Sequence, residues 1–184
     1  MERDVVQVLT EDHVVLRWLG ERLRTAPTSE ARSLMFNEFA RALGAHETVI
    51  DETVVPALRA CGWPELHSDV LTSHATLKRS FAELLTLGRN DPAFAAALAA
   101  LIRQLARHCE LEERKLLPLL HRCLDDAQRE MMAFDAEAHL TRILGNERPK
   151  ENAALAQPAN ELLEEAHVVL SSLPTPRDRS PVGP

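Results

Sequence analysis

The chain has 184 residues, enough for one domain with a full apolar core. Its formal net charge of −7 argues against nucleic acid or an anionic membrane as the main partner. Apolar runs stay shorter than a membrane span and the N-terminus lacks the character of a signal peptide, so we expect a cytoplasmic protein.

Apolar residues recur at three- and four-residue spacing along most of the chain, which predicts amphipathic helices. The first five are expected at about 4–25, 29–60, 65–87, 92–118 and 126–145. Asp4 and Asp125 can each cap a helix together with a Gln three positions on, and Pro56 is expected to bend the second helix. Four long helices with short connections indicate an all-α, up-down-up-down four-helix bundle with one or two extra C-terminal helices.

The last part of the chain is predicted to lie outside the bundle, which then spans residues 1–145. Residues 146–158 are rich in charge and small side chains, as in a linker. An amphipathic helix is expected at 159–173. Residues 174–184 hold several of the 11 prolines and are expected to be disordered.

Each of the four long helices carries one histidine on its predicted buried face. These are His13, His46, His74 and His108. One inward histidine is usually a core residue with its polar atoms satisfied. Four of them, one on each helix, favour a shared metal ion, because a metal can satisfy several buried imidazoles at once.

His108 and Glu112 lie four residues apart, so both can face one cation from the same side of a helix. Imidazole with carboxylate suits iron, manganese or zinc. For this pair alone, a core His with a Glu at the helix edge remains an equal alternative. The segment His46–Pro56 resembles the segment His108–Pro118 in the spacing of its His, acids and Pro. At the position of Glu112, however, the first segment has Ile50.

These features resemble the hemerythrin-like family, the HHE cation-binding domain, over about residues 4–122. The matching motifs are Glu11-Asp12-His13, His46 with Pro56, Ser73-His74, and His108 to Glu113 with Pro118. The resemblance implies a non-haem di-iron centre inside a four-helix bundle. It also implies His13, His46, His74, His108 and Glu112 as metal ligands.

Position 50 departs from the family pattern, because Ile50 replaces a bridging Glu. Glu47, about 100° around the helix from His46, is the residue we expect to take its place. Asp51 or Glu52 can do so only if the helix is distorted. A single iron, a weakly held metal, or haem held by a His are the alternatives.

Lys78 is the second departure. The oxygen-carrying members of the family have another His at this position, so reversible oxygen carriage is disfavoured. We expect Lys78 to extend toward solvent, and the alternative is an ion pair with Glu47 or Glu112.

The remaining histidines and the cysteines are expected to have no role as ligands. His67, His121 and His167 are expected at the surface, with a role as an accessory ligand as the alternative for His67, and His139 could cover the bundle. Cys109 is expected to pack between helices. An odd number of cysteines without a Cys-x-x-Cys pattern favours free thiols in a reducing compartment.

The resemblance implies an iron protein that binds or processes O2, peroxide or NO, as a sensor, a scavenger or a peroxide-decomposing centre. Whether it is an enzyme, of catalase-like or oxidase type, stays open. The alternative is a metal-depleted or haem-binding bundle that acts as a regulatory or interaction module. Small molecules are the expected partners, and a monomer or weak dimer the expected assembly.

Overall fold

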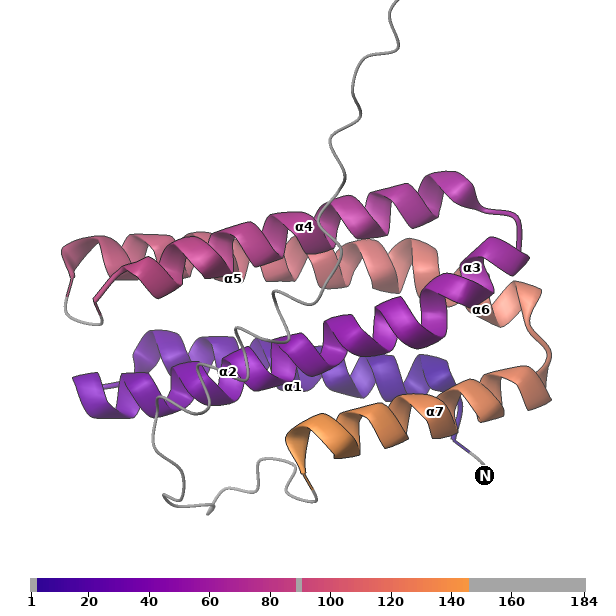
Figure 1. Ribbon diagram of the computed structural model, residues 1–184, viewed down its shortest axis with the longest axis horizontal. Helices are drawn as coiled ribbons and strands as arrows, with labels where there is room; N and C mark the ends of the chain where they lie inside the picture. Colours follow the sequence, from indigo (N-terminus) through magenta and orange to yellow (C-terminus); the bar gives the residue numbers. More distant parts are fainter. Residues whose placement is uncertain (1–2, 89–90, 146–184) are drawn as a thin grey trace, which may run out of the picture.

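The computed structural model describes residues 3–88 and 91–145, and this part is helical with short connections (Figure 1). Helices α1 and α2 form one pair, α4 and α5 form the other, and α7 lies along α1 and α2 (Figure 1). The elements are α1 (Val5–Thr25), α2 (Ser29–Val49), η1 (Ile50–Val54), α3 (Val55–Ala60), α4 (Pro64–Thr86), α5 (Pro92–Leu111), η2 (Glu112–Leu116), α6 (Leu117–Cys123) and α7 (Asp126–Leu144). The predicted all-α bundle and its fifth helix are confirmed, whereas the calls on 146–184 lie outside the described residues.

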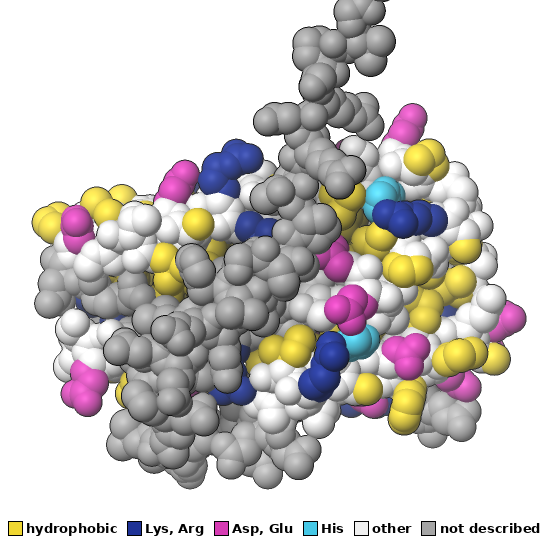
Figure 2. Space-filling view, viewed as in Figure 1, with side chains coloured by type: hydrophobic (Ala, Val, Ile, Leu, Met, Phe, Trp, Pro, Cys, Tyr) yellow, Lys and Arg dark blue, Asp and Glu magenta, His cyan; other side chains and the backbone are white. Residues whose placement is uncertain are grey.

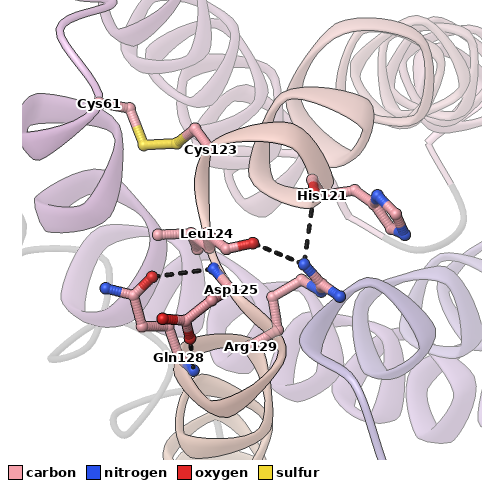
Figure 3. Close-up of a disulfide and its surroundings, with 7 residues drawn as sticks. All are labelled: Cys61, His121, Cys123, Leu124, Asp125, Gln128 and Arg129. Atoms are coloured by element: carbon pink, nitrogen blue, oxygen red, sulfur yellow. Dashed lines mark hydrogen bonds between the residues drawn. A yellow bond between two sulfur atoms is a disulfide. The ribbon is translucent and has the colours of Figure 1, made fainter.

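Both predicted capping pairs are present. The Asp4 side chain accepts from the Val6 amide at 2.7 Å, and Gln7 reaches back to the Asp4 amide. Asp125 and Gln128 make the same reciprocal pair at the start of α7 (Figure 3). These bonds satisfy amides that have no partner within a helix, which is why the helices begin at these residues.

The second and fourth predicted helices each contain a π-helical turn. Turn η1 separates α2 from α3, and η2 separates α5 from α6. Pro56 and Pro118 are the second residues after the ends of these turns. Proline has no amide hydrogen and its ring crowds the preceding turn, so the wider turn relieves a conflict that a regular α-helix would have there. The bend expected at Pro56 is therefore a change of helical register.

The apolar core forms two clusters with a polar layer between them. Along α1, Leu9 belongs to the cluster that α3, α6 and α7 close, and Leu16 belongs to the cluster toward the far end of the bundle. His13 lies between these two leucines on the same buried face. The polar layer is thus sealed above and below by packed side chains.

Cys61 and Cys123 are joined by a disulfide at the ends of α3 and α6 (Figure 3). The expectation of three free thiols was therefore wrong for these two residues. Each follows its histidine, His46 or His108, at the same spacing, so the echo between the two segments brings equivalent positions together. Cys109 is the free cysteine and is buried, as expected for a packing residue.

The surface carries charges of both signs. Figure 2 shows acidic and basic side chains interspersed with apolar ones on the face it presents. On α7, Met131 and Phe134 are exposed while Leu140 is buried. Among the residues described, none of the helices has the length and hydropathy to cross a membrane.

Candidate metal centre

The four predicted histidines converge in the polar layer. His13, His46, His74 and His108 come from α1, α2, α4 and α5, and each is at most 1% exposed. Their ring centroids lie 4.9 Å apart for His74 and His108, and 5.2 Å apart for His46 and His108. Packing of four helices has brought one imidazole from each to a common point.

All four rings present Nε2 to the carboxylate of Glu112. The distance to the nearer Glu112 oxygen is 3.0 Å for His13, 3.5 Å for His46, 3.6 Å for His74 and 3.4 Å for His108. Oε2 faces His13 and His46, whereas Oε1 faces His74 and His108. Glu112 thus lies at the centre of the cluster and offers one oxygen to each pair of rings.

The outer ring nitrogens have their own partners. Nδ1 of His46 lies 2.8 Å from Asp12, and Nδ1 of His13 lies 3.0 Å from Glu113. An ionised carboxylate only accepts, so these contacts favour a proton on Nδ1 and turn Nε2 inward, where its lone pair would serve a bound cation.

The other two rings have looser outer contacts. Nδ1 of His74 lies 3.5 Å from Asp51, and Nδ1 of His108 lies 3.2 Å from the hydroxyl of Ser73. Asp51 reaches His74 from the π turn η1, so the helix distortion that the sequence required for it is present. It lies against the outer nitrogen of His74.

Glu47 is fully buried next to this cluster, and neither of its carboxylate oxygens has a hydrogen-bond partner among the described residues. Nζ of Lys78 lies 3.5 Å from Glu47 and 3.9 Å from Asp51. Of the two alternatives for Lys78, the structure therefore shows the ion pair with Glu47. Burial raises the pKa of Glu47, because the anion loses its hydration.

Within the cluster, the charges of neighbouring groups and burial shift the pKa values in opposite directions. Burial alone would raise the pKa of Glu112, but the adjacent imidazoles, led by His108, hold it well below its usual range. Burial likewise lowers the pKa of His108 well below its usual range. For His74, burial is outweighed by Asp51 and Glu112, and its pKa rises to about 9. An ionised Glu112 surrounded by imidazoles is suited to a cation.

The two halves of the site repeat one plan. Arg17 follows His13 by four residues and pairs with Glu113 at 2.7 Å, while Lys78 follows His74 by four residues and pairs with Asp51. The π turns start at equivalent positions, as do the contacts of Asp12 and Ser73 with the outer nitrogens. The exception is Ile50, which occupies in the first segment the position that Glu112 occupies in the second.

The protein-family model of the hemerythrin HHE cation binding domain matches residues 4–120 of the sequence. The chain belongs to the hemerythrin HHE family. A crystal structure of a hemerythrin HHE cation binding domain-containing protein, an Rv2633c homolog from Mycobacterium kansasii, is similar at a TM-score of 0.75 and 22% identity. The match covers 93% of this chain and 99% of that chain, and at this identity it supports the fold. Comparison with curated proteins gives no match.

Four of the six residues that the sequence pointed to as ligands form one group that could hold a metal ion. His13, His46, His108 and Glu112 each offer one ligand atom, all within 4.8 Å of one another. Glu47 and His74 lie beside this group. The outer partners Asp12, Asp51 and Glu113 were not foreseen, although an acid directly before or after a ligand in the sequence was a usable signal for two of them.

The other histidines lie away from the cluster. The outer nitrogen of His139 is 3.3 Å from Glu52, at the surface between α7 and η1. His121 is exposed and His67 is half-buried. His167 lies outside the described residues.

Proposed function

We propose that this hemerythrin-like bundle holds non-haem iron and that the centre binds or processes O2, peroxide or NO. The ligands in this proposal are His13, His46, Glu47, His74, His108 and Glu112. Glu47 is the observation that carries it. A buried carboxylate without hydrogen bonds is costly, and a cation shared with the adjacent imidazoles would offset that cost.

The donor set fits iron. Imidazole nitrogen and carboxylate oxygen are ligands that iron accepts. The four Nε2 atoms already point toward Glu112. Oε1 of Glu112 and Nε2 of His74 also lack hydrogen-bond partners in the described chain. The protein thus presents inward-facing donor atoms from four helices, several of them without a hydrogen-bond partner in the described chain, as a metal site requires before the metal binds.

Two ions are supported better than one. Each Glu112 oxygen faces a different pair of rings, so each oxygen could hold a cation together with the pair of rings it faces. Glu47 lies on the side of His74 and Lys78, where a second ion needs a carboxylate in place of the one that Ile50 cannot provide. We therefore infer a di-iron centre with Glu47 recruited.

Bound iron would supply a redox centre with a coordination position for a small oxidant or diatomic molecule. The chain's own residues orient and shield it. Asp12 and Glu113 hold the rings of His46 and His13 in place, and partners of this kind typically change metal affinity by 10–100-fold. The apolar clusters on both sides keep bulk water away from the ligands.

Metal analysis of the full chain, purified without chelator, tests the proposal. We expect about two irons per chain and a lower melting temperature after chelation, because the ion binds the folded form alone. Less than about half an iron per chain, with unchanged melting after chelation, would leave a regulatory or interaction module. A sharp Soret band would point instead to haem.

Reactivity is tested on the iron-loaded protein. Addition of peroxide to the ferric form, or of NO or O2 to the ferrous form, should change the near-ultraviolet and visible absorption within the mixing time or shortly after. A loaded protein whose spectrum responds to none of the three would contradict this part of the proposal.

The role of Glu47 is tested by Glu47→Gln, which keeps the shape and removes the charge. Iron content should fall toward one ion per chain. Glu52→Gln is the matched control, since Glu52 lies on the same helical rod but is exposed and pairs with His139. Equal iron content in both variants would show that Glu47 is not a ligand.

A further inference from the structure

The outer partner of His108 differs in kind from those of the other three rings. Asp12, Glu113 and Asp51 give His46, His13 and His74 a carboxylate, but His108 has the neutral hydroxyl of Ser73. Ser73 stands in the second half of the site where Asp12 stands in the first. One of the four rings thus lacks the negative charge that supports the others.

A surface groove of about 340 Å³ lies over Ser73. Its wall on the α4 side includes Thr72, Ser73 and Thr76, and its wall on the α5 side includes Gln104 and Arg107. The volume is at the lower end of what small-molecule sites have. The groove is therefore large enough for a compact ligand that would touch the hydroxyl on His108.

The charges at the groove favour an anion. Asp69 lies at its edge, but it pairs with Lys115 at 3.4 Å. Arg107 has no carboxylate within ion-pair distance among residues 3–88 and 91–145. A guanidinium that has no such partner in the described part of the chain, beside hydroxyl groups, suits a carboxylate, because it donates two parallel hydrogen bonds.

Gln104 adds a second requirement. Its Oε1 atom is buried and has no hydrogen-bond donor in the described part of the chain. Because the atom is out of contact with solvent, a ligand hydroxyl would have to enter between α4 and α5 beside Gln104 to supply that donor. The groove therefore combines a cation for a carboxylate with an acceptor for a hydroxyl.

We propose that the groove binds a small 2-hydroxy acid, with the carboxylate on Arg107 and Ser73 and the hydroxyl donating to Gln104. Through Ser73 the ligand places a negative charge near the outer nitrogen of His108, as Asp12 does directly for His46. Binding is a property of the α4–α5 groove and needs no metal; its effect on the centre rests on the proposed function.

The test uses the full-length protein without metal, titrated with L-lactate and followed by isothermal titration calorimetry and amide chemical shifts. Propionate is the matched ligand, because it differs by the hydroxyl alone. Lactate should bind at least about tenfold more tightly than propionate, the factor that one buried hydrogen bond is worth. The largest shifts should fall on residues of α4 and α5 around Ser73.

Two variants and one control locate the site. Arg107→Gln should weaken lactate binding about tenfold or more, whereas Arg103→Gln, an exposed arginine one turn earlier on α5, should leave it unchanged. Gln104→Leu should reduce the preference for lactate over propionate to less than about twofold. Melting curves of all three confirm that they are folded.

Three results would overturn the inference. They are no lactate binding in the wild-type protein, equal binding of lactate and propionate, and a loss that is the same for Arg107→Gln and Arg103→Gln. None of them depends on iron, so the inference can fail while the proposed metal centre stands. The reverse also holds.

Discussion

Asp51 shows how a single side chain in this bundle acts through another. It lies on the outer nitrogen of His74, while the inner nitrogen of that ring faces Glu112. The same carboxylate is 3.9 Å from Lys78, which also pairs with Glu47. A small network near the surface thus orients one proposed ligand, His74, and places a cation beside another, Glu47.

Asp51→Asn should weaken iron binding without abolishing it. The amide keeps the contact with His74 but not the charge, and loss of such an outer partner typically lowers metal affinity by about 10–100-fold. Competition with a chelator of known affinity measures the change. The control is Asp69→Asn, an exposed acid on α4 that pairs with Lys115. An unchanged affinity for Asp51→Asn would show that this contact does not support the ligand.

Cys109 should be unreactive in the folded protein. It is buried in the apolar cluster, and burial raises the pKa of its thiol to about 12. Because the folded-state pKa is raised above 9.0, the neutral thiol contributes stability in full below pH 9.0 and loses it as the pH rises toward 12. Native protein near pH 8 should take up almost no iodoacetamide, whereas unreduced, unfolded protein should take up about one per chain. Fast labelling of the native protein would contradict this.

At the scale of elements, the two π turns decide which residues face the centre. Each begins at the position four residues after a ligand histidine, at Ile50 in η1 and at Glu112 in η2. Each is followed by a proline. The turn brings the next acid, Asp51 or Glu113, against the outer nitrogen of a histidine on another helix. The repeat therefore supplies ligands and outer partners together.

Ile50→Glu should restore the carboxylate that the first half lacks. Ile50 is fully buried and its position corresponds to Glu112, so the new side chain would face the ligands. In the metal-free protein the buried charge should lower stability by about 3 kcal/mol, and iron should recover most of the loss. Thermal melting with and without iron measures both effects, and the absorption spectrum should change.

Ile50→Gln is the control for this variant, because it introduces polarity without charge. It should destabilise the metal-free protein but gain little from iron. If Ile50→Glu loses the same stability with and without iron, then position 50 does not face the centre.

The sequence predicted the helices and the four histidines because both depend on periodicity, which a single chain displays. It also pointed to Glu47, because this acid directly follows His46 and could turn toward the site to replace the carboxylate that Ile50 lacks. It could not show that Asp51 contacts His74, because that contact depends on the register shift in η1. Nor did it reveal the disulfide, since the pairing of Cys61 with Cys123 depends on how two distant helix ends meet.

At the scale of the whole molecule, the disulfide and the proposed metal centre lie at different levels of the bundle. The disulfide joins Cys61 and Cys123 across 62 residues at one end, and the proposed histidine ligands come from the four long helices in the middle. Cys61→Ser with Cys123→Ser should lower the free energy of unfolding by about 4 kcal/mol, from the loop-closure entropy that the unfolded chain regains. Urea denaturation of the oxidised parent and the variant measures this loss.

The disulfide and the metal should stabilise the protein independently. The disulfide acts mainly on the unfolded chain, whereas iron stabilises by binding the folded form. Removing both should therefore cost the sum of the separate losses to within about 0.5 kcal/mol, as is usual for distant sites. A combined loss larger than this sum would show that the disulfide at the ends of α3 and α6 also positions the proposed ligands. A fall in iron content when the disulfide of the parent protein is reduced would show the same. Iron content before and after reduction distinguishes the two cases, because a purely entropic crosslink leaves the folded site unchanged.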